Sequence, residues 1–193
     1  PRRLEIGQAT AFKNYYTSGG MDMRWQVALL VTCRGGVRTA AEEESAQVIR
    51  ELVEEELRGV LTEERVVPDE RKEIQAALIE MTDYYRPHLV LTVGGSGVGP
   101  RDHVPDATML VVDRTVPGMT EAMRRKAMRR MPEAMLHRGV CGIRGGTLIV
   151  NLPGDPHGVH EHFSAILGTL PEALAAVSGA AAPAAEETEG GSG

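Results

Sequence analysis

The stretch that decides the fold is LVLTVGGSGVGPRDHVPDAT, residues 89–108. It opens with Leu89–Val93, which are apolar or β-branched, and a short apolar run bounded by turn residues is typical of a buried strand. The glycines that follow at Gly94, Gly95 and Gly97 leave their backbone N–H groups unshielded by side chains. Such a loop can hold a phosphate group, so we expect a strand followed by a candidate phosphate-binding loop.

Two charged residues follow this glycine loop directly. Arg101 carries a planar guanidinium group that is always positively charged. Asp102 is a candidate Mg²⁺ ligand or polar anchor. A glycine-rich turn after a strand often only reverses the chain, so a purely structural interpretation competes with the functional one. The loop lacks the GK[ST] ending of a P-loop, and Pro100 stands where the dinucleotide fingerprint has its third glycine. Spacing alone leaves the two interpretations equally supported.

Composition excludes several functional classes. The 193 residues are 42% hydrophobic and 25% charged, which suits one soluble domain with a full core. The net charge of −6 gives no reason to expect a nucleic-acid partner, and no apolar run approaches the roughly 20 residues of a membrane span. Cys33 and Cys141 form no motif, and the N-terminus has no secretory signal, so we expect a cytoplasmic protein with free thiols.

Strand and helix patterns alternate before the glycine loop. They predict a strand at Gln26–Thr32, a helix at Ala40–Arg58, a short strand at Glu64–Val67 and a helix beginning at Pro68–Asp69. With the strand at Leu89–Val93, this β-α-β-α-β order predicts an α/β fold with right-handed crossovers. We expect three layers, α/β/α, around a mostly parallel central sheet.

Ligands of parallel sheets bind outside the carboxyl ends of the strands. The loop Cys33–Thr39, Asp69 and the glycine loop all follow predicted strands, so we expect them to share one crevice. Asp69 is also a candidate N-cap of the helix after it, which would make its role structural.

The second half of the chain predicts further elements. Pro117–Gly118 is expected to form a turn before a helix at Thr120–Arg130. Strands at Gly139–Arg144 and Thr147–Asn151, joined by Gly145–Gly146, predict an additional hairpin beside the sheet.

A Pro-Gly turn at 153–156 then opens a helix and can offer N–H groups to an anion. A last helix begins at Pro171 and ends near Ser178. The clustered His157, His160 and His162 lack the spacing of a structural zinc site, so we expect them to be solvated or to cap a helix.

We expect three segments along the chain. Residues 1–22 are polar without a period and are predicted to form an N-terminal arm. Residues 23–178 are the folded domain, and residues 179–193, built from small and polar residues, are a predicted disordered tail.

The glycine loop also carries a resemblance. GGSGVGPRDHVPDAT, residues 94–108, resembles the GGTG-x-x-x-RD-x-TP-(D/E)-AT signature of the molybdopterin adenylyltransferases, which are the MogA and MoaB proteins and the related G domains of gephyrin and plant Cnx. VVPDE at 66–70, VPGMTEAMR at 116–124 and LIVNLPGDP at 148–156 fall in the family's order. The matches cover Trp25 to Leu170, and four matches in order are far more specific than one loop.

The resemblance implies a reaction in which the terminal phosphate of molybdopterin attacks the α-phosphorus of Mg·ATP and pyrophosphate leaves. Asp69 and Asp102 match the family's two functional aspartates and would position Mg²⁺ and the pterin phosphate. A homotrimer or hexamer and the molybdate-inserting protein are the implied partners. The implied substrate and phosphate contacts are Gly94, Gly95, Ser96, Gly97, Arg101, Thr32, Arg34, Pro117, Gly118, Glu121, Pro153 and Gly154.

The first loop departs from the family pattern. The family's S-x-S-D-(R/S) appears as Val31–Arg34, with Cys33 at the position of the acid. Its D-x-S-G element appears as Glu43–Ala46, with a longer acid and no glycine. These changes favour a non-catalytic molybdopterin-binding or assembly module, whereas retention of Asp69 and Asp102 favours the enzyme, which is our prediction.

Overall fold

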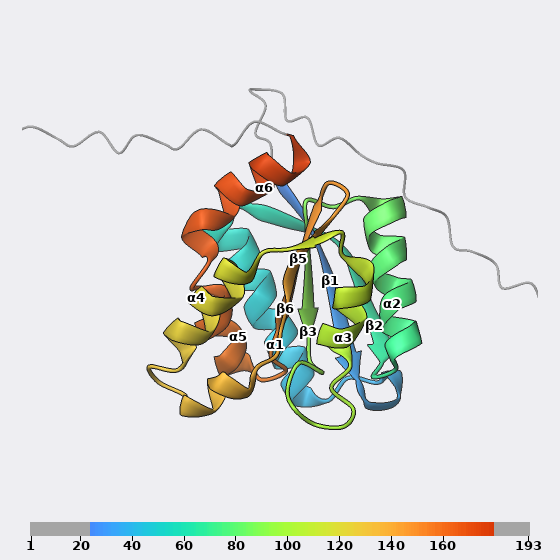
Figure 1. Cartoon of the computed structure of the whole chain (residues 1–193), viewed down its shortest axis with the longest axis vertical. Helices are drawn as coiled ribbons and strands as arrows, with labels where there is room; N and C mark the ends of the chain where they lie inside the picture. The colour runs from blue at the N-terminus through green and yellow to red at the C-terminus, as the bar shows by residue number, and fades with distance from the viewer. Residues whose placement is uncertain (1–23, 180–193) are drawn as a thin grey trace, which may run out of the picture.

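The computed structural model describes residues 24–179, so the predicted arm at 1–22 and all but the first residue of the predicted tail at 179–193 lie outside the described residues. Six strands form one sheet in the order β2-β1-β3-β6-β5-β4 (Figure 1). Neighbours among β2, β1, β3 and β6 run parallel, while β5 is antiparallel to β6 and β4. The strands are β1 Trp25–Cys33, β2 Gly59–Pro68, β3 Leu89–Val93, β4 Arg114–Thr115, β5 Cys141–Arg144 and β6 Thr147–Leu152.

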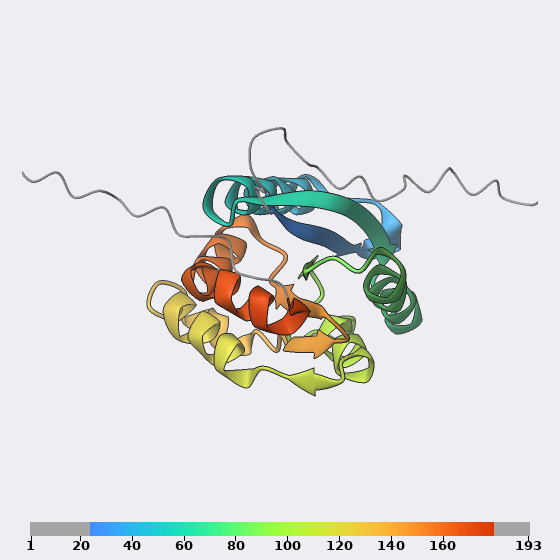
Figure 2. The same cartoon turned by 90° about the horizontal axis from the view of Figure 1, so that it is seen from above.

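Helices cover both faces of the sheet, which confirms the predicted three-layer α/β fold. Figure 2 shows α1, α4, α5 and α6 on one side and α2 and α3 on the other. The α-helices are α1 Ala40–Glu51, α2 Arg71–Glu80, α3 Val104–Val111, α4 Pro117–Ala127, α5 Pro156–Phe163 and α6 Leu170–Ser178. Short 3-10 turns lie at Arg34–Gly36, Pro132–Leu136 and Leu167–Thr169, and π turns at Leu52–Glu56 and Met81–Tyr85.

Alternation along β1 builds the two halves of the core. Val27 and Leu29 pack with the helices of the α1 side, whereas Ala28 and Leu30 pack with α2 and α3. Successive side chains of a strand point to opposite faces, so a strand covered on both sides must be apolar throughout. This is why β1 and β3 are recognisable in the sequence as continuous apolar runs.

Three sequence predictions need correction in the sheet and its connections. The second strand is longer than the predicted Glu64–Val67, because β2 is an edge strand whose half-exposed, polar side chains hide its start. The hairpin does not lie beside the sheet, since β6 pairs with β3 from Leu89↔Leu148 to Val93↔Leu152. Helix α3 has no counterpart among the predicted elements.

Two helix starts also differ from the predictions. Helix α2 begins at Arg71 with Glu70 at its N-cap position and no side-chain capping bond, so Asp69 is not a cap. Pro117 and Gly118 are the first residues of α4 rather than a separate turn, because proline is well suited to the first helical position.

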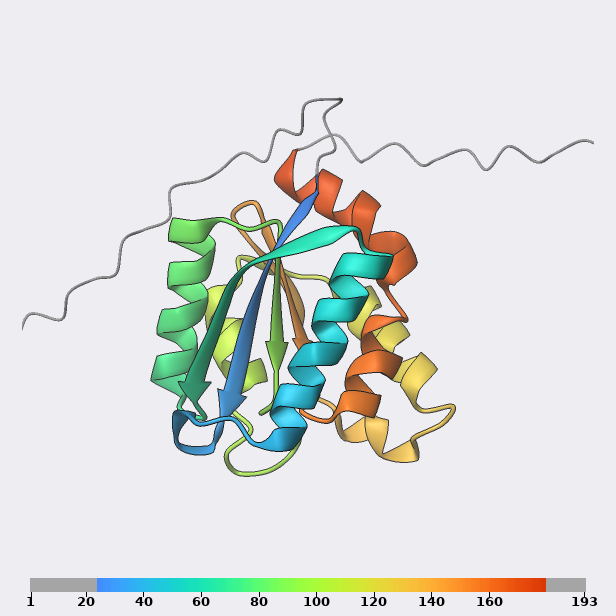
Figure 3. The same ribbon diagram turned by 180° about the vertical axis from the view of Figure 1, so that it is seen from behind.

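The parallel strands end together. Cys33 pairs with Pro68, and Val93 pairs with both Val31 and Leu152. Figure 3 shows the arrowheads of β1, β2 and β3 pointing to the same edge. The three segments that are predicted to share a crevice, residues 33–39, Asp69 and the glycine loop, therefore all follow strands that end at this carboxyl edge. Within residues 24–179, the helices are all too short or too polar to cross a membrane.

Candidate functional site

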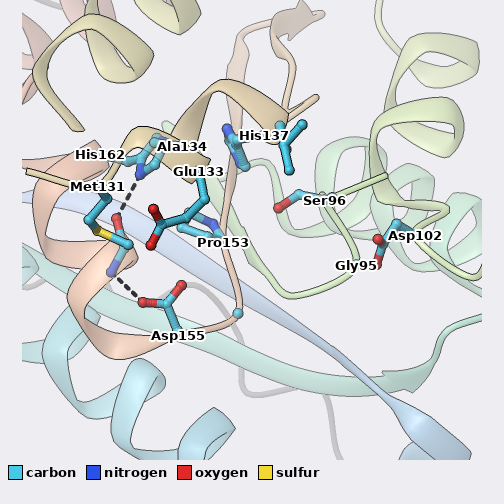
Figure 4. A pocket seen from close by; sticks show the side chains of 14 residues that line it. Gly95, Ser96, Asp102, Met131, Glu133, Ala134, His137, Pro153, Asp155 and His162 are labelled. Carbon is cyan, nitrogen blue, oxygen red and sulfur yellow. Dashed lines mark hydrogen bonds between the residues drawn. The ribbon is translucent and has the colours of Figure 1, made fainter. Parts of the chain in front are cut away.

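A cavity of about 340 Å³ lies at the carboxyl edge (Figure 4). One wall is the glycine loop, residues 95–97, with Asp102. A second wall comes from the segment 131–137 between α4 and β5, and a third from the turn 153–155 and the start of α5. This volume suits one small ligand.

The glycine loop is shaped by its contact with the end of β1. Gly94 and Gly95 have φ angles of +91° and +56°, a region that favours glycine. A Cβ atom on Gly94 would lie 2.6 Å from the Thr32 carbonyl oxygen, and one on Gly95 would lie 3.1 Å from Thr32 Oγ1. The Thr32 hydroxyl in turn donates to the carbonyl oxygen of Val93 at 3.2 Å. Only glycine allows this close approach between the loop and the end of β1.

Asp102 folds back into its own loop. Its Oδ2 accepts a hydrogen bond from the backbone N–H of Gly99 at 2.6 Å. A Cβ atom on Gly97 or Gly99 would lie 2.8 or 2.9 Å from the same oxygen, so a larger residue at either position would force the Asp102 carboxylate to move. The carboxylate therefore holds the loop closed, while the neighbouring Arg101 is exposed to solvent.

Arg138 fixes the loop from outside, and no sequence pattern singles this residue out. Its backbone N–H donates to the Ser96 carbonyl oxygen at 2.9 Å. Its guanidinium donates to the carbonyl oxygens of Gly97 at 2.7 Å and Asp102 at 2.6 Å. The same guanidinium forms an ion pair with Asp106 at 3.1 Å, which lowers the pKa of that carboxyl group. Arg138 thus bonds to four residues in and beside the glycine loop, which are Ser96, Gly97, Asp102 and Asp106.

The Asp69 side chain lies near Gly95 at the start of the glycine loop, whereas the Asp102 side chain bonds to Gly99 near its end. Asp69 Oδ1 is 3.8 Å from the ideal Cβ position of Gly95. Burial raises the pKa of Asp69, with the charges of Glu42 and Asp102 acting in the same direction and the nearby Thr32 and Arg101 side chains opposing them. A carboxyl group that is partly buried near other carboxylates favours a bound cation.

The turn at Pro153–Gly154 lies against the glycine loop and lines the cavity. A Cβ atom on Gly154 would lie 3.3 Å from Gly94 Cα, and the Ser45 hydroxyl donates to the Gly154 carbonyl oxygen at 2.9 Å. One N–H of the turn and helix start is already used within the chain, because the Asp155 side chain accepts from Gly158 N at 2.6 Å. The helix start is thus capped by its own chain.

The altered first loop is also at this edge. Cys33 is buried, and its thiol faces the Val67 carbonyl oxygen at 3.9 Å. Burial, followed by the charges of Glu42 and Asp69, raises the pKa of the thiol, so it stays neutral. Arg34 is exposed in the 3-10 turn that follows. The loop therefore carries no charge at Cys33.

Several predicted contacts lie outside the cavity wall. Thr32, Gly94 and Asp69 adjoin the glycine loop without lining the cavity itself. Three further predicted contacts lie on α4. They are Pro117, Gly118 and Glu121. All three are exposed near the start of that helix, whereas the nearest wall of the cavity begins at residue 131, beyond its end.

His162 was expected to be solvated and is instead buried. It packs against His137 with ring centroids 4.5 Å apart, and both rings line the cavity. Burial, then His162 and Arg124, lowers the pKa of His137 to about 3. Helical spacing could have shown that His162 falls on the face of Val159 and Phe163 rather than on the solvent side.

Comparisons with known proteins agree with one another. Residues 28–172 match a family described as a probable molybdopterin binding domain. The chain is 37% identical over 145 residues to the molybdopterin adenylyltransferase of Helicobacter pylori strain J99, covering 70% of this chain and 82% of that protein. It is 39% identical over 144 residues to the Escherichia coli K12 protein of the same name, covering 70% and 74%.

Solved structures give the same result. The molybdopterin biosynthesis enzyme MoaB of Thermus thermophilus superposes with a TM-score of 0.76 at 38% identity, covering 82% of this chain and 99% of that one. The molybdopterin biosynthesis Mog protein of Mycobacterium ulcerans gives a TM-score of 0.69 at 33% identity, covering 80% and 99%.

Proposed function

Because this chain belongs to the molybdopterin-binding domain family, we propose that it is an enzyme of molybdenum cofactor biosynthesis that adenylylates molybdopterin. The terminal phosphate of molybdopterin forms a bond to the α-phosphorus of ATP. The bond between the α-phosphorus and the β-bridging oxygen breaks, and pyrophosphate leaves. The observation that carries the proposal is the cavity at the carboxyl edge, walled by a glycine loop that Asp69 and Asp102 both approach.

Positioning is the main task of the protein in this chemistry. Backbone N–H groups of Gly94–Gly97 would hold a phosphate, and the loop is already fixed by Asp102 inside and Arg138 outside. A loop held in place before substrate arrives loses little entropy when the phosphate binds.

The two aspartates suit a magnesium ion. Mg²⁺ binds through one or two carboxylates and keeps waters and substrate phosphates as further ligands. Asp69 and Asp102 supply two hard oxygen donors, and the raised pKa of Asp69 is consistent with a carboxylate that gains from a nearby cation. When bound, Mg²⁺ would neutralise phosphate charge in the reaction.

The non-catalytic alternative is not favoured. Both aspartates adjoin the glycine loop, and the similar proteins of Helicobacter pylori and Escherichia coli are named adenylyltransferases. Cys33 leaves the first loop without a charge at that position, while Asp69 and Asp102 are both present beside the glycine loop.

We further propose a homo-oligomer, a trimer or a hexamer of two trimers. Met128, Met135 and Leu136 are 38%, 62% and 50% exposed around the end of α4, which supports burial against another copy. Light scattering should give a multiple of 20.8 kDa. The two buried free cysteines support a reducing compartment such as the cytoplasm, and the protein that inserts molybdate is the proposed recipient of the product.

The test is direct. Purified protein is incubated with molybdopterin and Mg·ATP, and adenylylated molybdopterin and pyrophosphate are both quantified. We expect equal amounts of the two products, and no product when EDTA replaces magnesium. Absence of the adenylylated product with intact, folded protein would support the binding-module alternative instead.

A further inference from the structure

Asn151 is a fully buried polar residue near the carboxyl end of β6. It lies within the stretch LIVNLPGDP, two positions before the turn that forms one wall of the cavity. The function proposed above gives this side chain no task. A buried amide is costly unless its polar atoms are paired, so its hydrogen-bond partners indicate why this position is polar.

The side-chain amide of Asn151 has three partners within the protein. Its Nδ2 donates to Thr92 Oγ1 at 3.1 Å and to Thr108 Oγ1 at 3.0 Å, and both threonines are fully buried. Its Oδ1 accepts from the backbone N–H of Val140 at 3.0 Å. A backbone N–H only donates, so the atom that faces Val140 must be the amide oxygen. The orientation of the amide is therefore set by its surroundings.

Each partner belongs to an element that carries a wall of the cavity. Thr92 lies on β3 directly before the glycine loop, and Thr108 lies on α3, which begins directly after that loop. Val140 follows the wall segment 131–137, and Asn151 itself precedes the turn at 153–155. One buried amide thus connects the elements that carry all three walls.

The backbone of Asn151 adds to these bonds without replacing them. Its N–H donates to the Val140 carbonyl oxygen at 3.0 Å, and Asn151 pairs with Thr92 in the parallel register of β3 and β6. Helix α3 lies outside the sheet, and the side chain of Asn151 reaches it at Thr108. Loss of the amide would therefore leave the sheet paired but loosen the placement of α3, and with it the end of the glycine loop.

We propose that Asn151 is a positioning residue for adenylyl transfer, which sets the glycine loop at a fixed distance from the other two walls of the cavity. The inference rests on the proposed function. Asn151 does not line the cavity, so it acts through the elements to which it bonds and not by touching a substrate.

The chemistry explains why this placement matters. Transfer of an adenylyl group requires the attacking phosphate and the α-phosphorus to be held in line, and little covalent chemistry is left for the protein. A displacement of about 1 Å between groups that hold the two substrates can cost on the order of 100-fold in rate. A residue that bonds to the elements behind all three walls controls this displacement.

Two variants and a matched control separate positioning from a general effect on folding. Asn151→Leu keeps the approximate size of the side chain and removes all three bonds. Thr108→Val removes only the link to α3. Thr147→Val is the control, because Thr147 is also buried, lies on the same face of β6 at its other end, and donates to the Pro87 carbonyl oxygen at 2.6 Å.

For each variant, kcat and the KM values for molybdopterin and Mg·ATP are measured per folded protein, with thermal melts as the check of folding. We expect kcat of Asn151→Leu to fall about tenfold or more, with a smaller change in either KM. Thr108→Val should change kcat in the same direction by a smaller factor. The control should keep kcat within about twofold of wild type although it also loses a buried hydrogen bond.

Hydrogen exchange provides a measurement that does not depend on activity. Amide hydrogens of residues 94–102 and 131–138 should exchange faster in Asn151→Leu than in wild type, and at the wild-type rate in the control. A wild-type kcat in folded Asn151→Leu, or an equal fall in the control, would overturn the inference. If Asn151→Leu does not fold, Thr108→Val decides by the same comparisons.

The two proposals can fail separately. If wild type makes no adenylylated product, the proposed function fails, and faster exchange at both walls in Asn151→Leu alone still supports the positioning of the walls by Asn151. If wild type is active while kcat and exchange are unchanged in the folded variant, the proposed function stands and the inference is wrong.

Discussion

Nη2 of Arg138 lies 2.6 Å from the carbonyl oxygen of Asp102, a residue 36 positions earlier in the chain. The bond joins the segment before β5 to the loop after β3. Nε of the same guanidinium donates to the Gly97 carbonyl oxygen, so this planar group bonds to two backbone carbonyl oxygens of the loop at once. This pair of bonds is called the fork below.

Arg138→Lys tests this fork. Lysine keeps the charge but cannot bond both carbonyl oxygens and Asp106 in one plane. We expect kcat/KM for adenylyl transfer to fall about tenfold or more and stability to fall by about 1–3 kcal/mol. Arg125→Lys, at an exposed position of α4, is the control. Equal activity of the two variants would show that the loop does not depend on the fork.

Gly95→Ala tests the close approach to Thr32. Gly145→Ala is a matched control, because Gly145 has a nearly equal φ of +54° and nothing within 4 Å of its ideal Cβ position. Both variants should lose about 1 kcal/mol of stability from backbone strain. Only Gly95→Ala should also lose activity, since its Cβ would lie 3.1 Å from Thr32 Oγ1 and Val104 Cγ2. Parallel loss of activity in both would contradict this.

Asp102→Asn keeps the size of the side chain and an oxygen that can accept from Gly99 N, but removes the charge. We expect adenylyl transfer to fall on the order of 100-fold with little change in Tm. Asp69→Asn should act in the same direction. It should not destabilise α2, because Asp69 makes no capping bond. An active Asp102→Asn enzyme would remove Asp102 from the catalytic site while leaving the family assignment intact.

Stability should fall in mild acid. Burial lowers the pKa values of His88, His137 and His162 below their ordinary value of 6.5, so the unfolded chain binds more protons than the folded one below that pH. The stabilisation is present above pH 6.5 and is lost as the pH falls from there toward 3, by up to about 1.4 kcal/mol per pH unit for each histidine. Urea unfolding between about pH 7.5 and 5 measures the slope. His137→Phe should make it shallower, and an unchanged slope would contradict the account.

Local parts of the fold could be predicted from short stretches of sequence. The strands β1 and β3 are covered on both faces, so their apolar runs are unambiguous. The order of elements predicted that the ends of the parallel strands meet at one edge of the sheet. The glycines of the loop indicated a backbone that other groups approach closely, as Thr32 does. Each of these features depends on a short continuous segment.

Features that depend on distant segments were missed. The hydrogen bonds from Arg138 to the carbonyl oxygens of Gly97 and Asp102 can be recognised only once β5 and β3 are placed in one sheet. The position of β6 next to β3 could not be inferred from the hairpin, because a hairpin pattern gives the pairing of its own two strands only. Helix α3 was not predicted, because its first residues, 104–108, also belong to the family signature that begins at the glycine loop.

The pairing of β3 with β6 has a consequence for the order in which the site is assembled during synthesis. The Ser96 hydroxyl donates to the Leu152 carbonyl oxygen at 3.2 Å, 56 residues later in the chain. A ribosome therefore releases the glycine loop, Asp69 and Asp102 well before the wall that supports them. Because β6 covers that edge in the folded sheet, β3 lacks its second neighbouring strand until residues 147–152 have been synthesised. The cavity at the carboxyl edge thus needs residues synthesised late in the domain to complete its walls.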